Sequence, residues 1–234
     1  MGYEDRVYGH YQFTEPVLLE LMETAAMRRL RGIMQHGVSA LIGLTSPVSR
    51  FDHSVGTLLL VKRLGGSLTE QIAALVHDVS HTAFSHVIDY VFDKHDDQSF
   101  HDEQKEKYLM QSDIPAVLMR HGYSWRDVLD DSQFTLLEQP APRLCADRLD
   151  YFFRDCLDLQ LANEQEVQEV LLQLAVVDGR IVTHSVEAAR WLAMTYIAAD
   201  DASWANFREV GLYELTALAI RRGIEIGAID EDDI

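Results

Sequence analysis

Apolar residues recur at helical spacing along most of the chain. Between residues 16 and 31 they include Val17, Leu21 and Leu30, and Pro16 stands where a helix would begin. Apolar positions three to four residues apart indicate an amphipathic helix. The same spacing predicts further helices over residues 53–64, 70–76, 82–92, 101–111, 114–121, 125–129, 143–161, 164–174, 185–199 and 203–223.

One segment departs from this pattern. Residues 175–182 form two runs rich in β-branched residues on either side of Asp178-Gly179. An Asp-Gly pair between two such runs is typical of a β-hairpin. We therefore predict an all-α helical bundle with one small β-hairpin near residues 175–183.

Composition narrows the classes of protein. Of the 234 residues, 38 are acidic and 20 are Lys or Arg, giving a net charge of −18, and only two are Cys. Such a charge disfavours binding to nucleic acids, and two cysteines cannot form a disulfide scaffold. No apolar run approaches the ~20 residues of a membrane span, and the first residues lack the pattern of a signal peptide. We expect a reduced, cytoplasmic protein.

The histidines suggest a metal site. There are ten of them, and the apolar run of residues 72–76 leads directly into His77-Asp78. Asp147 and Asp150 stand three residues apart in a predicted helix, so they share one face. Imidazole nitrogen and carboxylate oxygen together suit Mn, Fe, Ni, Zn or Mg. We expect a divalent metal ion of one of these kinds.

Four segments in order resemble the HD superfamily of metal-dependent phosphohydrolases. They are residues 24–37, 50–56 (Arg-Phe-Asp-His-Ser-Val-Gly), 77–86 (His-Asp-Val-Ser-His-Thr-Ala-Phe-Ser-His) and 147–155 (Asp-Arg-Leu-Asp-Tyr-Phe-Phe-Arg-Asp). The resemblance is to the branch of dGTP triphosphohydrolases and the SAM-and-HD-domain dNTP hydrolase. It implies one HD domain over residues 1–234, with a catalytic core at about 7–160 and a C-terminal hairpin and helices at about 161–229.

The resemblance also assigns the metal and the catalytic residues. It implies that the metal ligands are His53, His77, Asp78 and Asp147. His81 would contact the substrate phosphate or the attacking water. The resemblance further implies a proton donor at His101, oriented by Asp102. The pair His95-Asp96 follows no apolar run, so we do not expect it to bind metal.

A second set of positions would bind the substrate. By the resemblance, Arg50, Arg148 and Tyr151 hold phosphates or sugar, Asp155 contacts the sugar, and Gln35 contacts the nucleobase. The implied reaction is hydrolysis of a phosphate ester of a nucleotide or a related small molecule. The implied partner is that small phosphorylated substrate, with no nucleic acid surface, no membrane and a homo-oligomer as an open possibility.

Two alternatives keep the fold and change the function. In some HD proteins two irons support oxygenation of a C–H bond, and His81 and His101 could supply the extra ligands. A non-catalytic nucleotide sensor would keep the fold without the reaction. The Arg-Phe-Asp-His segment at residues 50–53 favours the phosphohydrolase branch, and the intact ligand set argues against a sensor.

Overall fold

The computed structural model describes residues 1–93 and 100–230 and confirms the all-α class. The first half contains β1 (Gly2–Asp5), β2 (Gly9–Gln12), α1 (Pro16–Met22), α2 (Ala25–Arg29), α3 (Gly37–Leu41), α4 (Arg50–Arg63), α5 (Leu68–Val76), α6 (Val87–Val91), α7 (Phe100–Gln111) and α8 (Ile114–Arg120). The second half contains α9 (Ala146–Asp158), α10 (Glu164–Gln173), β3 (Leu174–Val177), β4 (Arg180–Thr183), α11 (Val186–Ala199) and α12 (Phe207–Glu225). Short 3-10 turns cover Leu30–Gly32, Trp125–Val128 and Asp131–Gln133, and a π-helical turn covers Asp200–Trp204.

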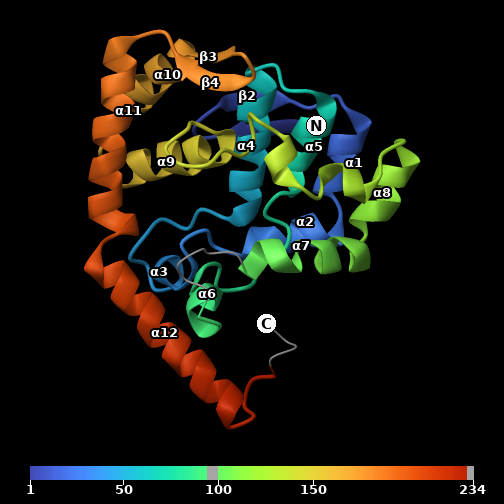
Figure 1. Ribbon diagram of the computed structural model, residues 1–234, viewed down its shortest axis with the longest axis vertical. Coiled ribbons are helices and arrows are strands. Elements are labelled where there is room, and N and C mark those ends of the chain that lie inside the picture. The colour runs from blue at the N-terminus through green and yellow to red at the C-terminus, as the bar shows by residue number, and fades with distance from the viewer. Residues whose placement is uncertain (94–99, 231–234) are drawn as a thin grey trace.

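Helix α4 lies at the centre of the molecule (Figure 1). It begins after Ser49, whose side chain accepts a hydrogen bond from the backbone N–H of Asp52, and most of its residues are buried. It packs against α5 on one side and α9 on the other. The approach to α9 requires Gly56, because a Cβ atom there would lie 2.0 Å from Oδ1 of Asp150. These three helices form the frame that carries the predicted metal ligands.

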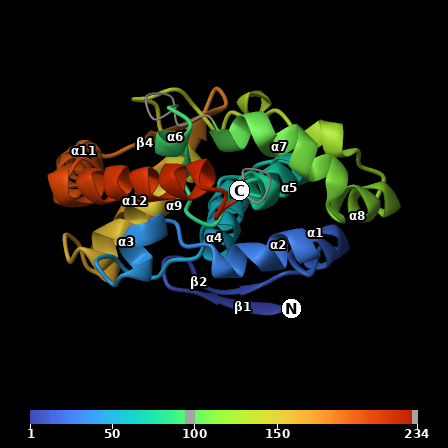
Figure 2. The ribbon, with the colours of Figure 1, turned by 90° about the horizontal axis from the view of Figure 1, so that it is seen from below.

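Helices α11 and α12 run along one edge of the molecule (Figure 1). Figure 2 shows α12 passing close to α6, and a small apolar cluster joins the two helices. Its buried members are Val87, Ile88, Val91, Ala217 and Ile220. The C-terminal helices are thereby attached to the part of the chain that contains the predicted motifs. Within residues 1–93 and 100–230, no helix combines the length and the apolar character that crossing a membrane requires.

The described part of the chain contains two hairpins where the sequence predicted one. The predicted hairpin is present as β3 and β4, and both Asp178 and Gly179 have positive φ in its turn. The second hairpin, β1 and β2, was missed because its sequence is short and polar. Its turn is held by Asp5, whose carboxylate accepts hydrogen bonds from the backbone N–H groups of Val7 and Tyr8 at 2.8 and 3.0 Å.

Two predicted helices were too long. The helix over residues 16–31 is interrupted after α1, because the Thr24 side chain accepts a hydrogen bond from the N–H of Met27 and starts α2. The helix over residues 82–92 is reduced to α6, and Ser85 before it has a positive φ of 49°. His95 and Asp96, which the sequence did not favour as ligands, lie outside the described residues.

Candidate metal centre and active-site cavity

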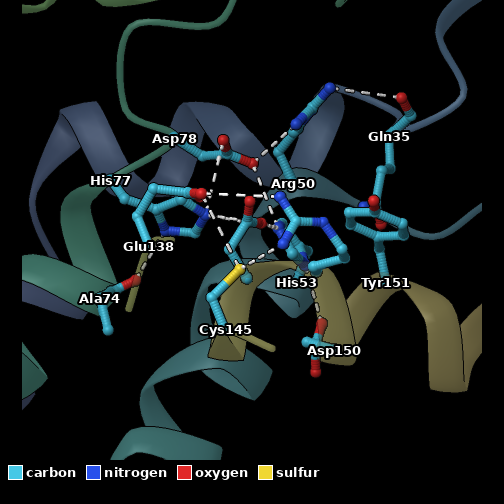
Figure 3. A network of polar contacts seen from close by, with 12 residues as sticks. Gln35, Arg50, His53, Ala74, His77, Asp78, Glu138, Cys145, Asp150 and Tyr151 are labelled. Atoms are coloured by element: carbon cyan, nitrogen blue, oxygen red, sulfur yellow. Dashed lines mark hydrogen bonds and ion pairs between the residues drawn. The ribbon is translucent and has the colours of Figure 1, made fainter. Parts of the chain in front are cut away.

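Three helices bring predicted ligands to one point. His53 lies in the first turn of α4, His77 follows α5 directly, and Asp147 lies in the first turn of α9. The residues at the end of α5 are fully buried, so His77 is held in place by the packing before it. Figure 3 shows His53 and His77 turned toward each other, with Asp78 and Arg50 beside them.

The ligand atoms of these three residues are within contact distance. Nε2 of His53 lies 2.8 Å from Oδ1 of Asp147 and 3.3 Å from Nε2 of His77. The Nε2 atom of His77 is 3.5 Å from the same Asp147 oxygen. Two imidazole nitrogens and one carboxylate oxygen form a suitable set for a divalent transition metal.

The other ring nitrogen of each imidazole is occupied. Nδ1 of His53 lies 2.8 Å from Oδ2 of Asp150, and Nδ1 of His77 lies 2.8 Å from the carbonyl oxygen of Ala74. Since both partners are acceptors, each Nδ1 donates its hydrogen away from the centre, and each Nε2 is left available to a cation, either a proton or a metal ion. These residues therefore fit a metal ion.

The electrostatics of this point also favour positive charge. Burial opposes protonation of His53, but hydrogen bonds to Asp147 and Asp150 outweigh it and raise the pKa of His53 to about 10. Burial would raise the pKa of Asp147, yet His53 and His77 hold it well below its usual value. A group of two histidines and two ionised carboxylates attracts either protons or a metal cation.

Asp78 lies between this group and a second one. Its Oδ2 accepts a hydrogen bond from Nη1 of Arg50 at 2.8 Å, and its Oδ1 is 3.6 Å from Nε2 of His77. The same Oδ1 is 3.1 Å from Nε2 of His81, whose ring stacks on that of His101 at 4.0 Å. Asp78, His81 and His101 therefore form another group that could hold a metal ion.

Both groups open into a cavity of about 790 Å³. Its walls come from α4, α6, α7 and α9, from the segments of residues 35–36, 77–86 and 129–138, and from α11, the π-helical turn and α12. The predicted site residues that line it are Gln35, Arg50, His53, His77, Asp78, His81, His101, Asp102, Asp147, Arg148, Tyr151 and Asp155. The structure thus brings the complete predicted set into a single cavity.

Comparison with known proteins identifies the family. The model described as the HD domain matches residues 50–155, which contain the four predicted metal ligands. A metal-dependent phosphohydrolase of Cordyceps militaris, cns2, is 38% identical over 97% of this chain and 67% of its own length. The chain belongs to the HD-domain family of metal-dependent phosphohydrolases. The predicted family and the predicted hydrolase class are confirmed.

Other matches agree with this HD-domain assignment. The uncharacterized protein YdhJ of Bacillus subtilis is 42% identical over the whole chain and 72% of its own length. The deoxynucleoside triphosphate triphosphohydrolase SAMHD1 of Danio rerio is 26% identical over 72% of this chain and 35% of its own. A phosphohydrolase structure from Bacteroides thetaiotaomicron has a TM-score of 0.71 at 20% identity, over 97% of this chain and 60% of that chain. These names give no support to the oxygenase or the sensor.

Two of the predicted substrate residues, Tyr151 and Asp155, already have side-chain partners in the cavity wall. The hydroxyl oxygen of Tyr151 lies 3.2 Å from that of Tyr196. Asp155 accepts hydrogen bonds from Nε2 of His36 at 2.8 Å and from Nε1 of Trp204 at 2.7 Å. The remaining three line the same cavity, and the side-chain oxygen of Gln35 is buried with no hydrogen-bond partner among residues 1–93 and 100–230.

The predicted proton donor, His101, has a competitor in His86, to which the sequence analysis assigned no role. Burial and the nearby His86 lower the pKa of His101 to about 4, and Asp102 lies 3.4 Å from its Nε2. The side chain of His86 also lines the cavity, and its Nδ1 lies 3.1 Å from the buried carboxylate of Asp89. The Ser-His ending of the 77–86 motif was the available signal for this residue.

A series of buried ion pairs lies behind His53, the first of the predicted ligands, and the sequence analysis did not predict it. Asp150, which contacts His53, accepts hydrogen bonds from Nε and Nη2 of Arg154 at 2.8 and 3.1 Å. Nη2 of Arg154 also donates to Oδ2 of Asp5 at 2.8 Å. Contacts beyond the ligands themselves fix the orientation of metal-binding imidazoles. The N-terminal hairpin is therefore connected to His53 through Arg154 and Asp150.

The C-terminal wall was also missed. Tyr196, Trp204, Glu209 and Tyr213 line the cavity from α11, the π-helical turn and α12. The Trp204 ring lies 4.8 Å from that of Tyr196 and 5.2 Å from that of Tyr151. No motif in the sequence signalled these residues, because their place in the cavity depends on how the C-terminal helices pack.

Proposed function

We propose that the protein hydrolyses a phosphate ester of a nucleotide or a closely related small molecule. The observation that carries the proposal is the meeting of His53, His77 and Asp147 at the inner end of a cavity whose other wall contains aromatic rings. Rings at this spacing offer faces and edges for a planar base. The name of the SAMHD1 relatives, which act on deoxynucleoside triphosphates, supports a nucleotide in particular.

The proposed metal ligands are His53, His77, Asp78 and Asp147. A divalent cation held there would supply Lewis acidity to a phosphoryl oxygen. Arg50 donates to Asp78 and also lines the cavity, so it orients that carboxylate and presents positive charge to the phosphate.

Proton transfer to the leaving oxygen is proposed for the histidines on the other side of the cavity. His101 remains the donor that the sequence predicts, oriented by Asp102. His86 is the second candidate, because the buried Asp89 carboxylate orients its ring in the manner of a catalytic acid–base pair. His81 is proposed to contact the phosphate, since its ring lies against those of both His86 and His101.

The remaining predicted contacts are proposed as substrate positions. Arg148 and Tyr151 would hold phosphate or sugar, Asp155 the sugar and Gln35 the base. The buried, unpartnered oxygen of Gln35 supports a ligand that donates a hydrogen bond there. A cytoplasmic location is proposed with them, supported by two buried cysteines that are not joined in a disulfide.

The test is a product-resolved screen. The protein is stripped of metal, reloaded separately with Mn, Fe, Ni, Zn and Mg, and incubated with ribo- and deoxyribonucleotides and simple phosphate monoesters. We expect metal-dependent release of phosphate or of a longer phosphate chain from at least one nucleotide. Release from none of them with any of these metals would refute the proposed function.

A further inference from the structure

The cavity has few cations for an enzyme that binds phosphate. Among the described residues that line it are three arginines or lysines and nine carboxylates, and two of those carboxylates are the proposed ligands Asp78 and Asp147. The other seven carboxylates are distributed over the start of α7, the segment of residues 130–138, α9 and the C-terminal helices. Most of the acidic groups facing the cavity are therefore not explained by the metal.

Each of the three cations already has partners. Arg50 donates to Asp78 at 2.8 Å, and Lys105 is buried and bonded to Asp131. Nη1 and Nη2 of Arg148 donate to two backbone carbonyls at 2.7 and 3.2 Å. Arginine binds phosphate most strongly when both nitrogens of its fork are available. Little positive charge is thus left for phosphates other than the one at the metal.

The C-terminal wall adds negative charge where the cavity is otherwise open. Glu209 on α12 is half-buried and accepts a hydrogen bond from the hydroxyl of Ser39. Asp200, exposed at the start of the π-helical turn, lies in the same lining. Such carboxylates accept hydrogen bonds from hydroxyl and amino groups, but they repel phosphate.

Size does not exclude a triphosphate from this cavity. Its volume of about 790 Å³ lies within the range of sites that bind drug-sized ligands. A nucleoside triphosphate would introduce two more phosphates than a monophosphate, in a space lined by seven carboxylates besides the two proposed ligands. Discrimination between the two would therefore be electrostatic rather than steric.

We propose that this enzyme prefers substrates with a single phosphate group, and that Asp200 and Glu209 act as specificity determinants against longer phosphate chains. This rests on the phosphohydrolase function proposed above and names its substrate class. The hydroxyl- and amino-bearing part of the substrate lies against the acidic wall, and its one phosphate lies at the metal.

The kinetic test compares each nucleoside monophosphate with its own triphosphate on the metal-loaded enzyme. We expect kcat/KM for the monophosphate to exceed that for the triphosphate at least tenfold. The double variant Asp200→Asn, Glu209→Gln should reduce this ratio at least fivefold by raising kcat/KM for the triphosphate. The matched control is Glu187→Gln, an exposed acid on α11 outside the cavity lining, which should leave the ratio within twofold.

A binding measurement makes the outcome independent of the base and of turnover. Inorganic phosphate and tripolyphosphate are titrated into the Mn-loaded protein, with the metal content checked at each point. Phosphate should bind at least tenfold more tightly than tripolyphosphate. Tighter binding of tripolyphosphate, or an equal or higher kcat/KM for triphosphates, would overturn the proposal. If no substrate is turned over, the proposed function fails and the titration still decides the charge preference.

Discussion

The two ends of the cavity are built differently. At the inner end, His53, His77 and Asp78 are all at least nine-tenths buried, and each contacts a further polar group of the frame. On the C-terminal wall, Trp204 and Glu209 are only partly buried, and they reach the cavity from helices packed along one edge of the molecule. The side chains of the inner end are held by the packing of the core, whereas those of the C-terminal wall are partly exposed and belong to helices at the edge of the molecule.

This difference suggests that the inner end carries out the reaction and that the C-terminal wall selects the substrate. Reaction chemistry requires groups held within a fraction of an ångström, which the packed ends of α4, α5 and α9 provide. Selection among substrates requires only that charge and shape of the wall suit one ligand better than another. Changes at the inner end should therefore abolish the reaction, and changes on the wall should alter which substrate is used.

The largest effect is expected from the inner end. Replacing His77 and Asp78 together by Ala removes two of the four proposed ligands, so the protein should lose its bound metal. Turnover should fall by a factor of roughly 10³ or more. Metal content and phosphate release measure the two effects separately.

The control for this variant is His184→Ala, which removes an exposed histidine far along the chain. It should keep the metal and the activity. Full activity of the double variant would mean that the inner end is not the metal centre, and the division between the two regions would lose its basis.

A second prediction concerns the proton donor. His101→Gln keeps the approximate size of the side chain but removes the proposed donor, so kcat should fall about 10²- to 10⁴-fold while metal content stays constant. His86→Gln, which removes the ring oriented by Asp89, should have a smaller effect on kcat. The reverse pattern, or a loss of metal in the His101 variant, would give the donor role to His86 and place His101 with Asp78 and His81 as a metal-binding group. Kinetics with metal analysis on both variants distinguish the two.

A third prediction tests the support behind the metal ligand. Arg154→Met leaves Asp5 and Asp150 as buried carboxylates without their cation, which costs about 3–5 kcal/mol of stability. Metal affinity should fall roughly 10- to 100-fold, because Asp150 no longer holds the ring of His53. Chemical denaturation and metal titration measure the two losses.

The matched control is Arg6→Met, in the turn of the N-terminal hairpin that also contains Asp5. Arg6 pairs with Asp158 near the surface, and an exposed pair contributes about 0–1 kcal/mol. If the Arg154 variant does not fold, Asp5→Asn removes the charge at the far end of the chain of contacts and tests the same idea more mildly. Unchanged metal affinity in a folded Arg154 or Asp5 variant would show that the hairpin plays no part in the metal centre.

The inner end could be predicted because its signals are local. His77 stands after five consecutive apolar residues, and the spacing of Asp147 and Asp150 within one helix is visible in the sequence. The structure brings together the predicted ligands that these signals indicated. The helical class followed from periodicity for the same reason, since both depend on residues only a few positions apart.

The ion pairs behind His53 and the C-terminal wall could not be predicted, because both depend on contacts between residues that are distant in the sequence. Asp5 and Arg154 are 149 residues apart, and Ser39 and Glu209 are 170 apart. The N-terminal hairpin contains few apolar residues, so its strands gave no periodic signal. Its buried Asp5 became significant only when Arg154 was placed against it.

The smallest effect is expected at His36, beside the wall, and it depends on pH. Burial lowers the pKa of His36, but Asp155 and then Glu209 outweigh burial and raise it above the ordinary 6.5. A raised histidine pKa stabilises the fold fully below about pH 6.5, and this stabilisation is lost as the pH rises through the folded-state pKa. His36→Gln should therefore lower Tm more at pH 6 than at pH 9. The loss of Tm at pH 6 should exceed the loss at pH 9 by about 2–4 °C for each 1 kcal/mol that the charged pair contributes to stability. The control variant His184→Gln should show no such difference. A pH-independent difference would mean that His36 and Asp155 form a neutral hydrogen bond rather than a charge pair beside the wall.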